Sequence, residues 1–198
     1  MQNNLDNPTI NVVLAGVGGQ GILLASEIIA RAAMAAGFAV KTNEVHGMAQ
    51  RGGSVLAQIR YGAVVHSPLV EHGAAQVLGS LERIESLRCA DYLAPAGLAV
   101  VSSQRVVPIT VSSGQAKYPE DAEARIRTAF PRLVYLDAVA MAGEIGNVKC
   151  SNLVILGALS TGLTLPAEAW QEGIRQSVKP KFVDINLRAF AAGAALDG

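Results

Sequence analysis

The chain has 198 residues, of which 51% are hydrophobic and only 16% are charged, so it is long enough and apolar enough to bury one compact core. Sixteen acidic residues balance sixteen basic ones, and no long block of like charge occurs, which argues against a nucleic-acid-binding protein. The start MQNNLDNPT has neither a basic segment nor an apolar core, and the longest apolar helix is interrupted by Glu27 and Arg31. We therefore expect no secretory signal, no membrane span and a cytoplasmic location.

The sequence contains two cysteines, Cys89 and Cys150, which are far apart and have no neighbouring cluster of potential ligands. A structural zinc site or an all-cysteine iron–sulfur cluster needs more sulfur ligands than this. We therefore expect the chain to hold no metal of its own.

Strands and helices are predicted to alternate from the N-terminus. The apolar run at residues 10–15 predicts a buried first strand, and the alanine-rich segment 20–36 predicts a helix that ends at Gly37. Residues 38–44 return as a second strand. Residues 53–60 alternate between two faces and predict a strand that turns at Tyr61-Gly62 into a short strand ending at Val65, which is a β-hairpin.

The rest of the chain continues the alternation and then becomes helical. Further strands are predicted at residues 75–78, 97–102, 105–111 and 133–136, and further helices at 81–92, 119–130, 139–145, 152–160, 166–178 and 184–192. Residues 1–198, with a core of about 10–193, are thus predicted to form a single three-layer, Rossmann-like α/β domain. Its sheet is expected to be mostly parallel with an antiparallel hairpin, and its C-terminal region helical.

The first candidate site is the glycine-rich turn between the first strand and the first helix, which contains Gly16, Gly18, Gly19, Gln20 and Gly21. Backbone amides in such a turn, together with the helix N-terminus, can bind a phosphate or carboxylate. The glycine spacing also matches the dinucleotide fingerprint, with Glu44 placed where a ribose-binding acid would lie. Equally, the glycines can simply allow a tight strand-to-helix turn.

The second candidate site is the run TNEVHGMAQRGGS at residues 42–54, which is denser in contact chemistry than core packing requires. Its candidate ligand-binding or partner-binding residues are His46, Gly47, Met48, Gln50, Arg51, Gly52 and Gly53. Arg51 can bind a carboxylate or phosphate with two parallel hydrogen bonds, or form a salt bridge within the loop, for example to Glu44. His46 can bind a ligand or serve as a structural hydrogen-bonding group.

Met48 is expected to pack at an interface, and the glycines Gly47, Gly52 and Gly53 to serve backbone geometry. Gln20 and Gln50 can donate to an anion or tie the two turns together. We expect the two turns to outline one site, and we assign no catalytic residue in this chain.

The motif His46-Gly47-Met48-Ala49-Gln50-Arg51-Gly52-Gly53 resembles the gamma-domain family of 2-oxoacid:ferredoxin oxidoreductases, and within it the small subunits that act on indolepyruvate. The resemblance covers nearly the whole chain, from Ile10 to Gly193. It is carried further by Gly16–Gly21 with Ile22-Leu23, Ser67-Pro68, Glu82, Glu85, Arg88, Pro108, Gly114, Tyr118-Pro119, Gly146-Asn147, Asn152, Leu156-Gly157-Ala158, Asn186, Ala189-Phe190 and Gly193. This chain has Gln76 where relatives usually carry an aspartate, which puts a polar role at that position in doubt.

The resemblance implies a heteromeric enzyme that oxidatively decarboxylates aryl 2-oxoacids such as indolepyruvate to the acyl-CoA and passes electrons to ferredoxin. It implies thiamine diphosphate and iron–sulfur clusters in a large partner subunit, with coenzyme A or another small anion possible at the interface. This chain is then expected to be inactive alone, with its two turns facing the partner, the substrate or coenzyme A.

Residues outside the two turns are expected to be structural. Glu82, Glu85 and Arg88 are expected to form a solvated or subunit-facing ion network, with Glu85 and Arg88 pointing outward. Gly146-Asn147 and Asn152 are expected to end one helix and begin the next.

Two alternatives from other classes stay open. A free-standing dinucleotide-dependent oxidoreductase would explain the first turn and Glu44 but leaves residues 46–53 without a role. A non-enzymatic anion-binding assembly module would use the same site without a catalytic partner.

Overall fold

The computed structural model describes residues 9–46, 52–107, 109–115 and 117–196. They contain a six-stranded sheet with the strand order β2-β3-β1-β4-β5-β6. The strands are β1 (Ile10–Val17), β2 (Ala39–His46), β3 (Ser54–Gly62), β4 (Ala75–Ser80), β5 (Leu93–Ser102) and β6 (Leu133–Leu136). Strands β1, β4, β5 and β6 are parallel, whereas β3 runs antiparallel to both of its neighbours, β1 and β2.

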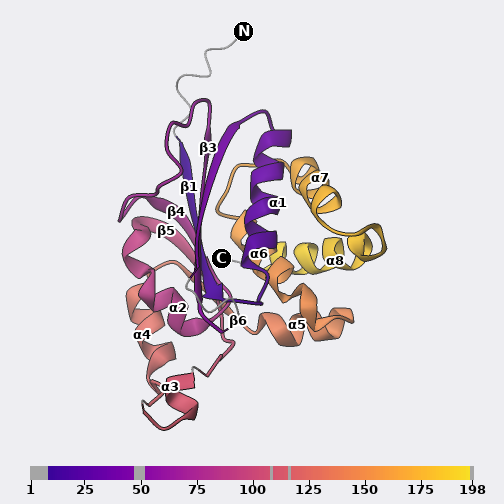
Figure 1. Cartoon of the computed structure of the whole chain (residues 1–198). Coiled ribbons are helices and arrows are strands. Elements are labelled where there is room, and N and C mark those ends of the chain that lie inside the picture. Colours follow the sequence, from indigo (N-terminus) through magenta and orange to yellow (C-terminus); the bar gives the residue numbers. More distant parts are fainter. Residues whose placement is uncertain (1–8, 47–51, 108, 116, 197–198) are drawn as a thin grey trace.

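Helices cover both faces of the sheet, which gives three layers (Figure 1). The α-helices are α1 (Ile22–Ala35), α2 (Arg83–Arg88), α3 (Ile109–Ser112), α4 (Ala122–Ala129), α5 (Ala138–Ile145), α6 (Ser151–Ser160), α7 (Ala167–Ser177) and α8 (Val183–Ala194). Short 3-10 helices are η2 (Ala90–Tyr92), η3 (Val148–Cys150) and η4 (Pro180–Phe182). Helices α1 and α6 pack on one face of the sheet, with α7 against α1 and α8 against α6, while α2 and α4 cover the other face.

The first strand shows why the sheet is buried on both sides. Val12 and Leu14 point into the core beneath α1 and α6, whereas Val13 and Ala15 point into the core beneath α2 and α4. A strand covered by helices on both faces needs apolar residues at every position, which is why residues 10–15 form a continuous apolar run. The predicted α/β fold with its mostly parallel sheet and helical C-terminal region is confirmed.

The predicted position of the hairpin is wrong. Strand β3 does not turn at Tyr61-Gly62 but continues through it, and Tyr61 pairs with Ile10 of β1 and Val40 of β2. Tyr61 is only 1% exposed, and burying such a large ring in the sheet outweighs a local turn preference. The antiparallel hairpin is instead formed by β2 and β3, and residues 63–65 are not a strand.

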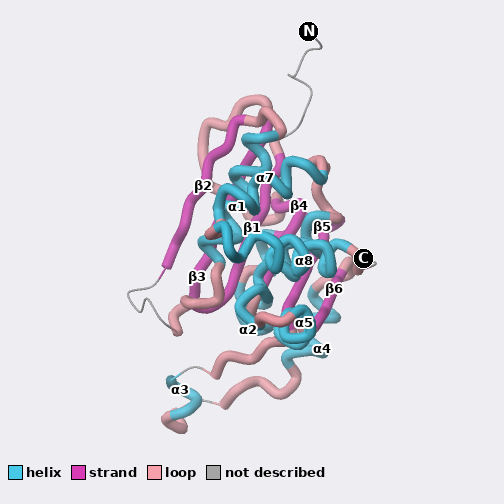
Figure 2. The backbone as a smooth tube through the Cα atoms, turned by 90° about the vertical axis from the view of Figure 1, so that its right-hand side faces the viewer, coloured by secondary structure: helices cyan, strands magenta, loops and turns pink. Residues whose placement is uncertain are grey.

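Two other predicted elements differ. The helix expected at residues 81–92 is the short α2 followed by the 3-10 turn η2. Of the strand expected at residues 105–111, the described residues 105–107 are not a strand, and residues 109–111 belong to the short helix α3. This segment instead begins an arm, which we define as the described residues between 103 and 119. The arm extends away from the sheet and carries α3 at its tip (Figures 1 and 2).

Gln76, the departure from the family pattern, does have a polar contact. Its side-chain Oε1 accepts a hydrogen bond from the backbone N–H of Asn11 at 2.7 Å, which ties the start of β1 to β4. Asn11 in turn donates to the carbonyl oxygen of Ala74 and accepts from Arg60. An uncharged amide can therefore take a structural role at this position.

Across the described ranges, no helix combines the length and apolar character needed to cross a bilayer.

Candidate functional site

The two glycine turns lie side by side. The backbone N–H of Gly18 donates to the carbonyl oxygen of Gly53 at 2.8 Å, and the N–H of Gly52 points back to the carbonyl oxygen of Gly18 at 3.5 Å. These contacts continue the antiparallel ladder of β1 and β3 past its last pair, Val17 opposite Ser54. The sequence-based expectation that the turns outline one site therefore has a geometric basis, since the ladder brings the two strand ends together.

Gln20 holds the first turn in place. Its side-chain Oε1 accepts from the backbone N–H of Val17 at 2.7 Å, while its Nε2 donates to the carbonyl oxygen of Leu81 and to Oε1 of Gln104, both at 2.9 Å. These hydrogen bonds do not tie the first turn to the second, as one of the two sequence-based expectations for Gln20 had it; the two turns are joined by backbone contacts instead. The elements tied are the first turn, the entry to α2 and the base of the arm.

Two glycines of the first turn are needed for close approach. A Cβ atom on Gly16 would lie 2.8 Å from Oε1 of Gln20, so a side chain there would displace the amide that fixes the turn. Gly21 has a φ of 86°, and a Cβ atom would lie 2.6 Å from Nδ2 of Asn152. Only glycine meets both conditions at position 21 without strain.

Asn152 does not begin a helix, so that prediction is wrong. Helix α6 starts at Ser151, and its N-cap residue is Cys150. Asn152 is 3% exposed, and its Nδ2 donates to the carbonyl oxygen of Gly21 at 3.3 Å, so it supports the glycine turn. The other half of the prediction is confirmed, because Gly146 ends α5 in the left-handed conformation. The sequence did contain a signal for this role, because an asparagine in an otherwise apolar helix is expected to be buried and to need a hydrogen-bond partner.

A cavity of about 440 Å³ opens beside the first turn. Its walls are largely apolar and include Val17, Ile22, Leu23 and Val55, and the exposed His46 at the end of β2 also lines it. Gly18, Gly19 and Gly21 form the side of the cavity from which α1 begins, and no side chain of the described residues caps that helix N-terminus. A helix N-terminus carries partial positive charge, so the cavity can accept an anionic group beside an apolar one.

Glu44 lies in a different place. It is exposed and lines a separate hollow with Thr42 of β2 and Leu24 and Glu27 of α1. Strand β3 separates β2 from β1, whereas the dinucleotide fingerprint places the acidic residue on the strand next to the first one. Glu44 therefore does not stand where a ribose-binding acid is expected.

The centre of the second turn is outside the described residues. Gly47, Met48, Gln50 and Arg51 belong to this segment, and the roles predicted for them stay predictions. His46 and Gly52 are the described residues on its two sides.

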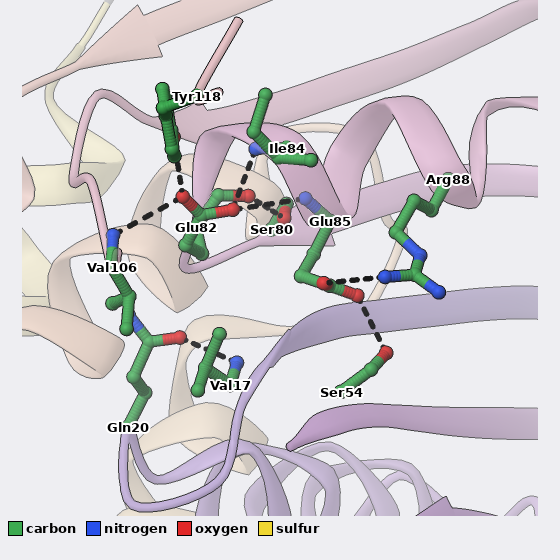
Figure 3. Close-up of polar contacts among 10 residues, drawn as sticks. All are labelled: Val17, Gln20, Ser54, Ser80, Glu82, Ile84, Glu85, Arg88, Val106 and Tyr118. Carbon is green, nitrogen blue, oxygen red and sulfur yellow. Dashed lines mark hydrogen bonds and ion pairs between the residues drawn. The ribbon is translucent and has the colours of Figure 1, made fainter. Parts of the chain in front are cut away.

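Glu82, the N-cap residue of α2, and Glu85 within this helix are both buried. Of the predicted solvated or subunit-facing ion network, the solvated form is therefore wrong for these two carboxylates. Glu82 is 2% exposed and Glu85 is 7% exposed. One oxygen of Glu82 caps α2 by accepting from the backbone N–H groups of Ile84 at 2.6 Å and Glu85 at 3.0 Å. The other oxygen accepts from the hydroxyl of Tyr118 at 2.8 Å and the N–H of Val106 at 3.3 Å (Figure 3).

Glu85 links α2 to the start of β3. Its Oε2 accepts a hydrogen bond from the hydroxyl of Ser54 at 2.5 Å, and its Oε1 is 3.6 Å from the exposed guanidinium group of Arg88 (Figure 3). A smaller hollow of about 240 Å³ lies here, between Glu85, the rim formed by Gly52 and Ser54, and Tyr118 of the arm. The sequence missed this burial because a Glu–Arg pair three residues apart is typical of a solvated helix face.

Tyr118 is held as a neutral donor. Burial is the main cause that raises the pKa of its phenol to about 12, so the hydroxyl stays protonated and donates a hydrogen bond to Glu82. The guanidinium groups of Arg83 and Arg105 both lie over its ring, at 4.8 and 4.1 Å from the centroid, and Nε of Arg83 also donates to its oxygen at 2.9 Å.

The model of the family described as pyruvate ferredoxin/flavodoxin oxidoreductase matches residues 11–196. The chain belongs to this family. It is 43% identical over 188 residues to the protein named indolepyruvate oxidoreductase subunit IorB of Archaeoglobus fulgidus, a match that covers 93% of each chain. It is equally 43% identical to the protein of that name from Pyrococcus horikoshii, covering 92% of this chain and 93% of the other.

Solved structures share the fold. The gamma subunit of a keto/oxoacid ferredoxin oxidoreductase from Geobacter sulfurreducens superposes with a TM-score of 0.68 at 22% identity, covering 93% of this chain and 95% of that one. The 2-oxoglutarate:ferredoxin oxidoreductase from Magnetococcus marinus, determined with 2-oxoglutarate, coenzyme A and succinyl-CoA bound, gives a TM-score of 0.69 at 21% identity. That match covers 94% of this chain but only 30% of the larger one.

The residues of this chain do not fit an iron–sulfur cluster. Cys89 and Cys150 are both buried and unpaired, and they lie on opposite sides of the sheet. Burial raises the pKa of the Cys89 thiol to about 11 and also raises that of Cys150, which opposes the thiolate form that a metal requires. No group of three potential metal ligands occurs among the described residues.

Proposed function

We propose that this chain is the small subunit of a heteromeric indolepyruvate, or aryl 2-oxoacid, ferredoxin oxidoreductase. The observation that carries the proposal is the 43% identity to the two archaeal IorB proteins over nearly the full length of both chains. Family membership alone would leave the substrate open, because this chain also matches relatives named for ketoisovalerate and 2-oxoglutarate. The sequence identity to those relatives is lower, at 28–30%.

The chemistry of such an enzyme is oxidative decarboxylation of the 2-oxoacid to its acyl-CoA thioester, with two electrons passed to ferredoxin. Thiamine diphosphate and iron–sulfur clusters supply that chemistry, and we assign both to a large partner subunit. This chain has two cysteines in all, and neither is placed to bind a cluster. The contribution of this chain to the enzyme is therefore a binding surface. The cytoplasmic location expected from the sequence stays a prediction.

We place that surface at the two glycine turns. Gly18, Gly19 and Gly21 line the cavity next to the N-terminus of α1, and Gly16 and Gln20 belong to the same turn. This cavity suits a carboxylate or a phosphate of substrate or coenzyme A. His46, Glu44 and residues 47–53, including Arg51, are assigned to the contact with the partner subunit or with a small anion there. Gln20 acts indirectly, by holding the turn through three hydrogen bonds.

Of the alternatives, a dinucleotide-dependent oxidoreductase is disfavoured by the position of Glu44, two strands away from β1. A non-enzymatic assembly module would use the same cavity, and it is separated from the proposal by experiment.

The test is reconstitution. The purified chain should be colourless and should not reduce viologen with indolepyruvate and coenzyme A, whereas adding the cognate large subunit should give indolepyruvate-dependent reduction of viologen or ferredoxin. Activity of the chain alone would contradict the proposal, and so would a large subunit that is fully active without it. Saturable NADH binding would favour the dinucleotide-dependent alternative.

A further inference from the structure

The tip of the arm projects from the rest of the fold. Its tip helix α3 has four residues, which is too short to be stable on its own, and it has no extensive contact with any other described helix or strand. Both views show it standing away from the sheet (Figures 1 and 2). Ordering such a segment loses conformational entropy, so its position needs support at the base.

That support is a polar clamp on Glu82. The same carboxylate oxygen accepts hydrogen bonds from Val106 on the outgoing part of the arm and from Tyr118 on the returning part (Figure 3). Burying a carboxylate is unfavourable unless its hydrogen bonds are satisfied, and here four donors satisfy it. The base is thus closed by one buried charge.

The clamp is continuous with the glycine turn. Gln104, at the start of the arm, receives a hydrogen bond from Gln20, and its carbonyl oxygen accepts from the N–H of Arg83. The hollow of about 240 Å³ lies between the arm and the rim formed by Gly52 and Ser54. A macromolecule that covers the glycine turns would therefore meet the arm as well.

The arm presents apolar and basic groups to solvent. Val107 is 45% exposed, and Arg105 and Lys117 are exposed cations on its two sides. No acidic residue occurs among the described residues of the arm itself; Glu82 and Glu85 beneath it are buried, and the exposed Glu120 and Asp121 follow it along the chain. The exposed surface of the arm therefore suits a partner with an apolar depression bordered by acidic side chains.

We infer that the arm is a docking element for the large subunit, with Val107 as its apolar contact and Arg105 and Lys117 as its charged border. This inference rests on the proposed function. A second copy of this chain is a poorer occupant, because a two-fold axis that pairs the arms would bring like charges together.

The test compares two equal substitutions on the reconstituted complex. Val107→Asp should weaken binding of the chain to the cognate large subunit by at least tenfold, measured by biolayer interferometry. Val64→Asp changes an equally apolar side chain that is 53% exposed beyond the opposite end of β3, and it should leave the affinity unchanged. In the wild-type complex, amide hydrogen exchange of residues 103–107 and 117–118 should be slower than in the free chain.

Each outcome decides the inference. The inference is overturned if the wild-type chain binds the large subunit and the Val107→Asp variant binds it equally well. It is also overturned if the chain self-associates and only Val107→Asp abolishes that association, which would assign the arm to a second copy. If Val107→Asp does not fold, the hydrogen exchange of the wild-type complex decides alone. A wild-type chain that fails to bind the large subunit would refute the proposed function itself, and this inference with it.

Discussion

The crossing of α6 and α8 depends on two glycines that face the opposite backbone. A Cβ atom on Gly157 would overlap the carbonyl oxygen of Phe190 and lie 2.8 Å from the N–H nitrogen of Ala194, and a Cβ atom on Gly193 would overlap the carbonyl oxygen of Val154. Both obstacles are helical backbone atoms that cannot rotate away. Gly157→Ala should therefore force the two helices apart.

The expected magnitude follows from two opposing effects. Overpacking of a well-packed core costs about 1–3 kcal/mol, and overlap with backbone belongs at the upper end of that range. Alanine in place of glycine returns about 1 kcal/mol of helix propensity. We expect Gly157→Ala to lower the free energy of unfolding by about 2 kcal/mol, or the melting temperature by roughly 4–8 °C for a chain of this size.

Gly143→Ala in α5 is the matched control. Its Cβ atom would meet only Cγ1 of Val148 at 3.6 Å, an ordinary contact, so the propensity gain should remain and raise stability by about 0.5–1 kcal/mol. Urea unfolding followed by circular dichroism measures both variants. The reasoning is refuted if Gly157→Ala is as stable as Gly143→Ala. Asn152 lies in the first turn of α6 and donates a hydrogen bond to Gly21, so a shift of α6 should also loosen the glycine turn.

Two further predictions concern Gln20 and Cys89. Gln20→Leu removes three hydrogen bonds that tie the first turn, so it should lower the free energy of unfolding by about 2–3 kcal/mol in urea titrations, and an unchanged midpoint would contradict the role given to this side chain. Cys89 has a folded pKa of about 11 against 9.0 in the unfolded chain, so its burial contributes stability that is complete below pH 9 and is lost as the pH rises from 9 towards 11. At pH 8 a thiol reagent should label it only in denaturant, and rapid labelling of the folded chain would show that this thiol is accessible.

The sequence predicted the adjacency of the two glycine turns better than it predicted the position of the hairpin. The end of β1 and the start of β3 are marked by glycines, and strand ends that carry polar or glycine-rich turns meet at one edge of a sheet. The hairpin was misplaced because Tyr61-Gly62 has the local character of a turn, whereas the position of Tyr61 depends on pairing with Ile10 and Val40 on two other strands. Local propensity carries no information about such pairing.

The burial of Glu82 and Glu85 was outside the reach of sequence reasoning for the same reason. Their spacing with Arg88 is that of a solvated helix face, whereas the contacts that accompany their burial come from distant segments, the arm for Glu82 and Ser54 of β3 for Glu85. Tyr118 is the residue that completes this change, and it lies 36 positions away from Glu82 along the chain.

The closed base of the arm has an evolutionary consequence. Because Val106 and Tyr118 meet on one carboxylate, the intervening residues form a closed excursion whose length is decoupled from the sheet. Insertions or deletions within it would change its reach without disturbing strand pairing. Homologous chains could thus fit differently shaped assemblies by varying this one excursion while retaining the same catalytic architecture.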